Sequence, residues 1–273
     1  MLHHSRRPGQ ASYALLAGVL LVLATALLAG CAQQPAAPAY PTKPIEIIVP
    51  FAAGGGTDVV SRIVGEYVSA KWGQPVNVVN KPGGGGTPGT VEVIQAKPDG
   101  YTLTMLAAST SILNPALQSD LPYKWNDMTY IARLVLSPLA LVVKADSPYN
   151  SLKDLVEAIK KDPSKFKYGS SGVAGPSTFG TAQLLESAGI DPTKVDRVPF
   201  DGGAPTVAAV AGGHVDFAAQ NLSEVLPLVT GGKLKALAVT TPERVAELPD
   251  VPTAKESGYE GFKQVGVFGL AGP

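Results

Sequence analysis

A glycine-rich segment, Pro50-Phe-Ala-Ala-Gly-Gly-Gly-Thr-Asp58, stands between a predicted strand and a predicted helix. Glycines let backbone N–H groups approach a ligand closely, and the start of a helix adds partial positive charge. In open α/β sheets, ligands bind at the carboxyl ends of the strands, where this segment lies. It could bind a carboxylate or another anion, although a plain strand-to-helix turn has the same pattern. The candidate contacts are Ala53, Gly54, Gly55, Gly56, Thr57 and Asp58.

Two later segments have the same placement between a strand and a helix. Gly169–Thr178 (GSSGVAGPST) offers hydroxyl groups and amides, and Pro199–Pro205 (PFDGGAP) offers a carboxylate beside two glycines. Asp201 could bind a ligand amine, orient a water or cap the helix that follows. Neither segment fits the G-x-S-x-G pattern of a hydrolase nucleophile. The candidate contacts here are Ser171, Gly172, Ser177, Thr178, Asp201, Gly202 and Gly203.

The remaining residues give little support for catalysis, a metal or a cofactor. Cys31 is the single cysteine, and beyond His3 and His4 the chain has only His214, which we interpret as structural. A thiolate zinc site is therefore excluded, and a Ser-His-Asp triad would depend on one ring. Gly83–Gly89 formally matches G-x-G-x-x-G, but Pro88 interrupts it and no acid follows about 20 residues later. We interpret it as a structural loop and expect no cofactor.

Composition excludes other classes. The 22 Lys+Arg balance the 22 Asp+Glu, and a net charge of +0 argues against a nucleic-acid partner. An apolar fraction of 45% is too high for a disordered chain.

The N-terminus is predicted to be a lipoprotein signal peptide over residues 1–30. Arg6 and Arg7 precede an uncharged apolar run, and Leu28-Ala29-Gly30-Cys31 resembles the lipobox at which bacterial lipoproteins are cleaved and acylated. An uncleaved membrane anchor is the alternative. Residues 31–41 are expected to be a tether, with Cys31 lipidated. The folded part would then lie in the periplasm or on the outer face of the cell membrane. Removal of Arg6 and Arg7, with no acid, would leave a charge of −2.

Strands alternate with helical patterns in two α/β units, at about 42–140 and 144–240, before a last strand at Phe262–Leu270. Among them we predict strands at Ile45–Val49 and Thr102–Ala107 and a helix at Gly203–Ala211. This pattern predicts two open lobes around a cleft, joined by extended crossings. We expect lobe 1 over 42–140 plus 263–273 and lobe 2 over 141–262. A helix from Thr57 to Lys71 is predicted with Thr57 as N-cap, and Ser151–Asp154 is predicted to form a capping box.

An ordered set of motifs runs along residues 40–270: Tyr40-Pro-Thr-Lys-Pro-Ile45, Val49–Asp58, Asn80-Lys-Pro-Gly-Gly-Gly-Gly86, Lys97-Pro-Asp-Gly-Tyr-Thr-Leu103, Asn114-Pro115, Gly202-Gly-Ala-Pro205, Gly212-Gly-His-Val-Asp216, Gly231–Ala238 and Leu248-Pro-Asp-Val-Pro-Thr253. This ordered set resembles the substrate-binding proteins of tripartite tricarboxylate transporters, the Bug (Bordetella uptake gene) family.

The resemblance implies a type II periplasmic binding protein, a non-catalytic trap whose two lobes close on a small carboxylate. It implies ligand contacts at Ala53 to Asp58, Ser171–Ser177 and Asp201–Gly203, with Ser109, Thr110 and Asn221 lining the cleft. The closed form would dock on membrane permease subunits. Many members carry Trp in the last strand, where this chain has Val267-Phe268 as pocket wall. Members also continue past the position of Pro273 into helices that pack on the first lobe.

Several alternatives remain open at this point. The ligand could be a di- or tricarboxylate, an acidic amino acid or an aromatic acid such as nicotinate or terephthalate. A lipoprotein of this fold could instead sense the ligand for a membrane signalling partner. An extracytoplasmic esterase is the third possibility, and it lacks an evident nucleophile with a base in reach.

Overall fold

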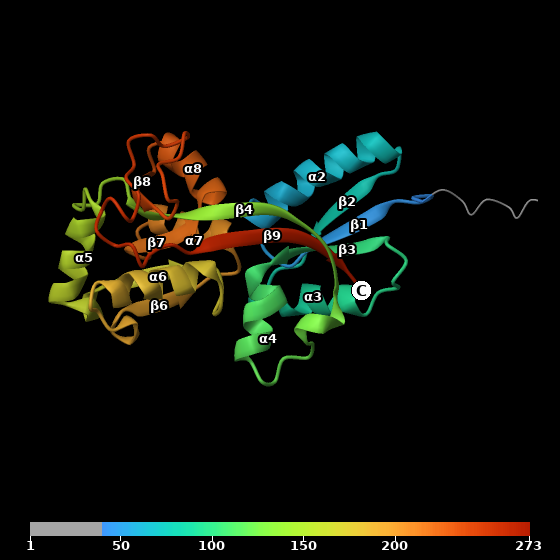
Figure 1. The fold of residues 1–273 in the computed structure, drawn as a ribbon, viewed down its shortest axis with the longest axis horizontal. Coiled ribbons are helices and arrows are strands. Elements are labelled where there is room, and N and C mark those ends of the chain that lie inside the picture. The colour runs from blue at the N-terminus through green and yellow to red at the C-terminus, as the bar shows by residue number, and fades with distance from the viewer. Residues whose placement is uncertain (1–39) are drawn as a thin grey trace, which may run out of the picture. The chain divides into compact units, whose positions relative to one another are not determined.

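The computed structural model describes residues 40–273, and Lys43–Pro273 form one folded unit (Figure 1). The predicted signal peptide, the lipidation site Cys31 and the tether up to residue 39 lie outside the described residues. Within the part that is described, none of the helices has the length and apolar character needed to cross a membrane.

The first lobe is built on a parallel β-α-β-α-β unit. Its elements are β1 (Ile45–Val49), α2 (Gly56–Trp72), β2 (Val76–Asn80), α3 (Thr87–Ile94) and β3 (Thr102–Ala107). β1 lies between β2 and β3 and is parallel to both. The segments predicted at Ile45–Val49 and Thr102–Ala107 are confirmed as strands. The carboxyl ends of β1 and β3 therefore lie side by side, each followed by a turn of backbone at the same edge of the sheet.

Two long strands run between the lobes. β4 (Thr129–Lys144) is antiparallel to β9 (Val265–Gly272) over Thr129–Pro138, and β9 also pairs with β3. The second half of β4 leaves β9 and pairs with β7 and β8 of the other sheet. Figure 1 shows these two strands crossing from one lobe to the other. They are the extended crossings expected from the sequence.

The second lobe has a mixed sheet with helices on both faces. β5 (Lys167–Ser170) lies parallel to and between β6 (Asp196–Pro199) and β7 (Phe217–Asn221), while β4 lies between β7 and β8 (Leu234–Val239). Alternate residues of β4 face opposite sides, so Leu139, Leu141 and Val143 belong to one core and Ala140 and Val142 to another. The covering helices are α5 (Leu152–Lys161), α6 (Pro176–Ser187), α7 (Gly203–Ala211) and α8 (Leu222–Thr230).

The two-lobe α/β fold is thus confirmed. The boundary predicted at residues 140 and 141 falls inside β4, which belongs to both sheets, so the exact division into lobes stays a prediction. Short helical turns complete the chain: η1 (Gly84–Gly86), η2 (Ser109–Leu113), α4 (Asn114–Leu117), η3 (Trp125–Asp127), η4 (Pro163–Lys165) and η5 (Pro192–Lys194).

The start of α5 has the capping box that was predicted from Ser151 and Asp154. The Ser151 hydroxyl accepts a hydrogen bond from the Asp154 amide at 3.1 Å, and the Asp154 carboxylate accepts one from the Ser151 amide at 3.0 Å. The predicted capping box is confirmed, and the apolar face of this helix is buried.

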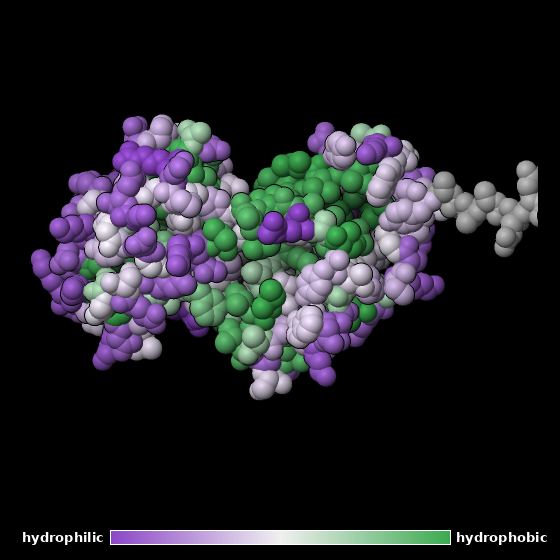
Figure 2. All heavy atoms as spheres, in the orientation of Figure 1, coloured by the Kyte–Doolittle hydropathy of each residue, from purple (hydrophilic) through white to green (hydrophobic). Residues whose placement is uncertain are grey.

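The start of α2 does not follow the expectation. Its N-cap is Gly55, without a side-chain cap, and Thr57 lies inside the first turn, so the predicted Thr57 cap is wrong. The helix buries its small residues Ser61 and Gly65, because a side chain at Gly65 would come within 3.3 Å of Val76 on the sheet. Its large apolar residues Ile63 and Tyr67 are consequently exposed. Figure 2 shows hydrophobic surface gathered over this lobe.

Candidate functional site

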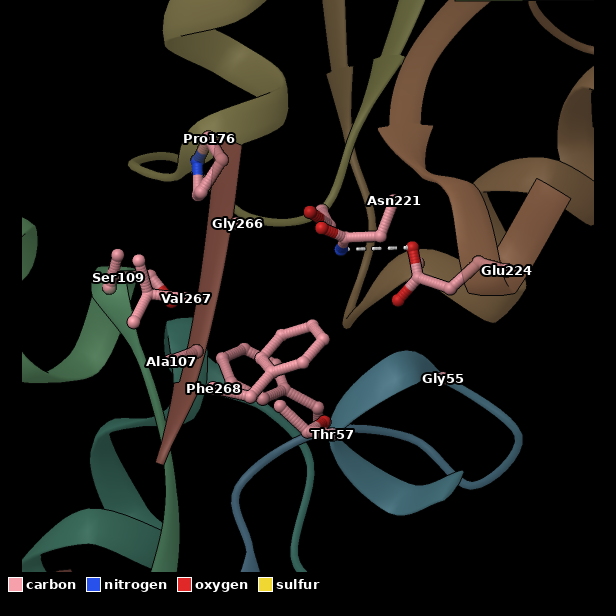
Figure 3. Close-up of a pocket in the computed structure, with 14 residues that line it drawn as sticks. Gly55, Thr57, Ala107, Ser109, Pro176, Asn221, Glu224, Gly266, Val267 and Phe268 are labelled. Carbon is pink, nitrogen blue, oxygen red and sulfur yellow. Dashed lines mark hydrogen bonds between the residues drawn. The ribbon is translucent and has the colours of Figure 1, made fainter. Parts of the chain in front are cut away.

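A small cavity lies between the lobes at the carboxyl ends of their strands. Its volume is about 40 Å³, and Figure 3 shows the residues that surround it. The first lobe contributes the β1–α2 loop and the end of β3, the second lobe the starts of α6, α7 and α8, and β9 forms the floor. The lining residues are Phe51, Gly55, Thr57, Ala107, Ala108, Ser109, Ser171, Pro176, Gly203, Asn221, Glu224, Gly266, Val267 and Phe268.

Six of the residues that the sequence analysis singled out meet in this cavity: Gly55, Thr57, Ser109, Ser171, Gly203 and Asn221. Val267 and Phe268, expected as pocket wall, also line it. Among these described lining residues there is no Lys, Arg or His, so the donors that a bound anion could use are hydroxyls, side-chain amides and helix-start N–H groups.

Other predicted residues support the cavity from behind. Ser177 accepts a hydrogen bond from the Ser171 amide and lies 3.0 Å from the Ser171 hydroxyl. The Thr178 hydroxyl donates to the Gly172 carbonyl at 3.3 Å, and the Thr110 hydroxyl donates to the Ala107 carbonyl at 3.2 Å. Ser177, Thr178 and Thr110 therefore satisfy the turns that begin α6 and η2.

The loops of the two lobes touch beside the cavity. The Ala52 amide donates to the Asp201 carbonyl at 3.2 Å, and a side chain at Gly202 would come within 3.4 Å of Phe51. The Asp201 side chain is exposed and, with Gly172, lines a separate hollow of about 800 Å³. Asp201, Gly172 and the exposed Ala53 thus lie apart from the small cavity.

Asp58 acts on its own loop. It is the third residue of α2 and is 3% exposed, and its carboxylate accepts hydrogen bonds from the Gly54 amide (2.9 Å) and from the Arg62 Nε (3.1 Å) and Nη2 (2.9 Å). Burial alone would raise the pKa of Asp58, but the hydrogen bonds from Arg62 and Gly54 outweigh it and hold that pKa below its ordinary value. The carboxylate therefore fixes the glycine loop in place.

Sequence reasoning missed Glu224, the one charged side chain of the lining. It is 9% exposed and is the third residue of α8. Its Oε1 accepts a hydrogen bond from the Gly56 amide of the other lobe at 2.8 Å. Its Oε2 accepts one from Asn221 Nδ2 at 3.3 Å, which Figure 3 shows. Burial raises the pKa of Glu224 above its ordinary value, despite these hydrogen bonds.

Gly203 makes room for that carboxylate. A methyl group on Gly203 would overlap both Glu224 carboxylate oxygens, so any larger residue there would force the Glu224 carboxylate to move. The starts of α2, α7 and α8 therefore converge on one carboxylate that belongs to the chain. A signal was present in the sequence, since Asn221 and Glu224 are three residues apart at the end of a strand, but an acid in the first turn of a helix is common.

His214 and the Gly83–Gly89 loop, which we interpret as structural, do not line the small cavity. His214 lies exposed in the turn after α7, and among the described residues no group of three or more His, Cys, Asp or Glu could hold a metal ion. In the Gly83–Gly89 loop, Gly86 has a φ of +89° and packs against Thr110 and Phe51. That loop is a support for η2.

Comparison with known proteins decides the family. The family model described as "Tripartite tricarboxylate transporter family receptor" (TctC) matches residues 60–273. The chain belongs to the TctC receptor family. Among curated relatives, a UPF0065 protein from the gbd 5′ region of Cupriavidus necator is 34% identical over 264 residues, covering 94% of this chain and 77% of its own length. Protein BugT of Bordetella pertussis is 31% identical over 261 residues, covering 95% and 78%.

Several solved structures have the same fold as this chain. The periplasmic binding protein BugD superposes with a TM-score of 0.79 at 36% identity, covering 86% of this chain and 77% of its own. MatC from Rhodopseudomonas palustris with bound malate gives 0.79 at 31%, covering 86% and 79%. Rpa4515 from the same organism, with adipate, gives 0.82 at 28%, covering 86% and 78%. The resemblance to the Bug family is confirmed, and so is the two-lobe binding-protein fold.

This TctC chain is a solute-binding protein. Its family and structural relatives are periplasmic binding proteins and not enzymes, so the esterase alternative is set aside.

Proposed function

We propose that this TctC protein captures a small carboxylic acid between its two lobes and delivers it to a membrane permease of the tripartite tricarboxylate type. The observation that carries the proposal is the interlobe cavity, which is lined by hydroxyls and helix starts and by no basic side chain among the described residues. Relatives of the same fold hold malate and adipate. Recognition of an acid in such a site is local, because amides and helix dipoles add nothing to the formal charge.

Binding requires the lobes to separate first. A cavity of about 40 Å³ holds one or a few water molecules and not a four-carbon acid. Separation breaks the contacts from Gly56 to Glu224 and from Ala52 to Asp201, and β4 and β9 are the strands about which the lobes would move. The candidate ligand contacts are those of the cavity lining together with the predicted Ser177, Thr178, Gly202 and Thr110.

The location follows from the predicted N-terminus. With Cys31 acylated, the protein would be held by lipid at the periplasmic or outer face of a membrane, next to its permease. Mass spectrometry of the N-terminal peptide tests this: a diacylated Cys31 supports it, and a chain beginning at another residue contradicts it. Loss of uptake of the ligand in a strain lacking the gene tests delivery.

A thermal-shift panel of small carboxylates tests the binding proposal on the purified protein. Specific binding raises the unfolding midpoint with increasing ligand concentration. Gly55→Val should abolish that shift, because Gly55 faces the cavity in an extended conformation that valine can adopt. Ala70→Val, an exposed change on the same helix, is the control. A midpoint raised by an uncharged sugar and by none of the acids would contradict the proposal.

A further inference from the structure

The cavity of this acid-binding family carries an acid of its own. Glu224 is the only charged residue among the described lining, and α7, α8, β7 and β9, which surround it, have no other charged side chain. On the facing helix α2, Asp58 and Arg62 pair with each other. A ligand that approaches Glu224 therefore meets one negative charge without a protein cation to balance it.

Glu224 already occupies the anion position that the glycine loop provides. Its Oε1 accepts a hydrogen bond from the Gly56 amide at the start of α2, at 2.8 Å. The Glu224 carboxylate also packs against Gly203 at the start of α7. A ligand carboxylate cannot use the same amide while Glu224 holds it. The hydroxyl donors left to such a carboxylate are those of Thr57, Ser109 and Ser171. Figure 3 shows Ser109 on the side of the cavity away from Glu224.

Few donors surround Glu224, and none of them carries a positive charge. Asn221 is nine-tenths buried, its Nδ2 is directed to Glu224, and its Oδ1 has no hydrogen-bond partner among the described residues. Glu224 Oε2 accepts the Asn221 side-chain bond at 3.3 Å, and the Asn221 backbone amide also stabilises this carboxylate. Two acceptors that line one cavity and are short of donors favour a ligand that brings a donor.

Electrostatics also favours a ligand that brings a donor to Glu224. A plain dicarboxylate would place its two negative charges beside a buried carboxylate, where like charges repel strongly because little water screens them. A protonated amine in that position would neutralise Glu224 and supply it with a positively charged donor.

We propose that Glu224 is a specificity-determining residue that selects small acids carrying a protonated amine, with the amine at Glu224 and Asn221 and the carboxylate at Ser109 and Ser171. The inference rests on the proposed function and narrows its substrate class to amino acids. It makes Glu224 the residue that discriminates against simple di- and tricarboxylates.

Matched acids test this inference on the purified wild-type protein. L-Aspartate, L-malate and succinate have one four-carbon skeleton and differ by an ammonium, a hydroxyl or a hydrogen at one carbon; L-glutamate and glutarate repeat the pair at five carbons. Isothermal titration at pH 7.5 should give tighter binding of the amino acid than of its dicarboxylate by about tenfold or more, the effect of one charged hydrogen bond, with malate between.

Glu224→Gln is the variant that assigns the preference to this residue. It should reduce the ratio of amino-acid to dicarboxylate affinity to about one, because the charge that pairs with the amine is gone. Glu186→Gln, the same change at an exposed position of α6, should keep the wild-type ratio. The wild-type ranking needs no variant, so it tests the inference even if Glu224→Gln folds poorly.

Three results would overturn the inference. One is equal or tighter wild-type binding of succinate than of aspartate. Another is tighter binding of every acid to Glu224→Gln, which would make the Glu224 carboxylate a competitor for the ligand's position. The third is succinate binding that strengthens from pH 7.5 to 5 in wild type but not in Glu224→Gln, because a protonated Glu224 would then donate to the ligand. If no acid binds either protein, the proposed function itself fails.

Discussion

Two carboxylates occupy the same position in two helices of this protein, and the fold treats them in opposite ways. Asp58 is the third residue of α2, and Glu224 is the third residue of α8. Both are buried, and both helices begin at the cleft. The pKa of Asp58 is held below its ordinary value, whereas the pKa of Glu224 is raised above it.

The partners explain the difference. Asp58 has a guanidinium one turn along its own helix and an amide four residues earlier in its own loop. Glu224 has only neutral donors, and the stronger one comes from the other lobe. Asp58 pairs with Arg62 and stabilises the glycine loop before α2. Glu224 has no cation as a partner, so its carboxylate remains available to a ligand. The starts of α2 and α8 therefore differ in role, although both carry an acid in the first turn.

The largest expected effect comes from crowding Glu224. Gly203→Ala places a methyl group on its carboxylate, and overpacking of this kind should lower the free energy of unfolding by about 2–3 kcal/mol. Urea denaturation measures it. Gly55→Ala at the facing helix start is the matched control, because its methyl group comes no closer than 3.4 Å to any neighbour.

A double variant sharpens that result. Glu224→Ala in the Gly203→Ala background should recover most of the loss, because the two positions share one space. If Gly203→Ala is as stable as wild type, or if Glu224→Ala brings no recovery, Glu224 does not depend on Gly203.

Neutralising Asp58 should have the next largest effect. Asp58→Asn removes the charge that accepts two bonds from Arg62, so the free energy of unfolding at pH 7 should fall by about 2 kcal/mol. Chemical denaturation checks the change, with Asp120→Asn at an exposed position as control. An unchanged stability would mean that Asp58 does not fix the loop, and the contrast with Glu224 would fail.

Neutralising Glu224 should have a smaller effect of opposite sign. Glu224→Gln at pH 7 should raise the free energy of unfolding by about 1 kcal/mol, since it removes a buried charge that no cation compensates. A turned Asn221 amide can then accept a hydrogen bond from the new Gln amide through its Oδ1, which lacks a partner in the described part of the wild-type chain. A loss of stability at pH 7 would show that the ionised carboxylate is itself stabilising.

The pH dependence of that difference supplies an independent check. The pKa of Glu224 is raised in the folded state, so the folded protein binds this proton more tightly than the unfolded chain does. The free energy of unfolding therefore decreases as the pH rises. Wild type should therefore match or exceed Glu224→Gln below the ordinary value of 4.5 and fall behind it as pH rises through the folded pKa. The difference between wild type and Asp58→Asn should have the opposite trend and shrink as pH falls. Denaturation midpoints between pH 3 and pH 8 measure both differences. If the two differences change with pH in the same direction, the contrast between Asp58 and Glu224 is wrong.

Local rules in the sequence predicted much of this fold. The strands Ile45–Val49 and Thr102–Ala107, the helix Gly203–Ala211 and the Ser151 capping box were readable because hydrophobic runs, glycines and caps act within a few residues. The three glycine-containing loops were correctly expected to lie at strand ends near one cleft.

What the sequence could not predict depends on distant neighbours. The Gly56 amide that Glu224 accepts from is 168 residues away along the chain, and no local pattern reports that contact. The buried face of α2 could not be predicted from the sequence either. The helix packs closely against the sheet through its small residues Ser61 and Gly65, and the larger Ile63 is exposed to solvent.

A crystal structure of the protein with bound L-aspartate or L-glutamate tests the role of Glu224 most directly. We expect density for the ligand between the lobes, its amine within about 3 Å of the Glu224 carboxylate and a ligand carboxylate at Ser109 and Ser171. A ligand carboxylate on the Gly56 amide, with Glu224 displaced from the cavity, would contradict it.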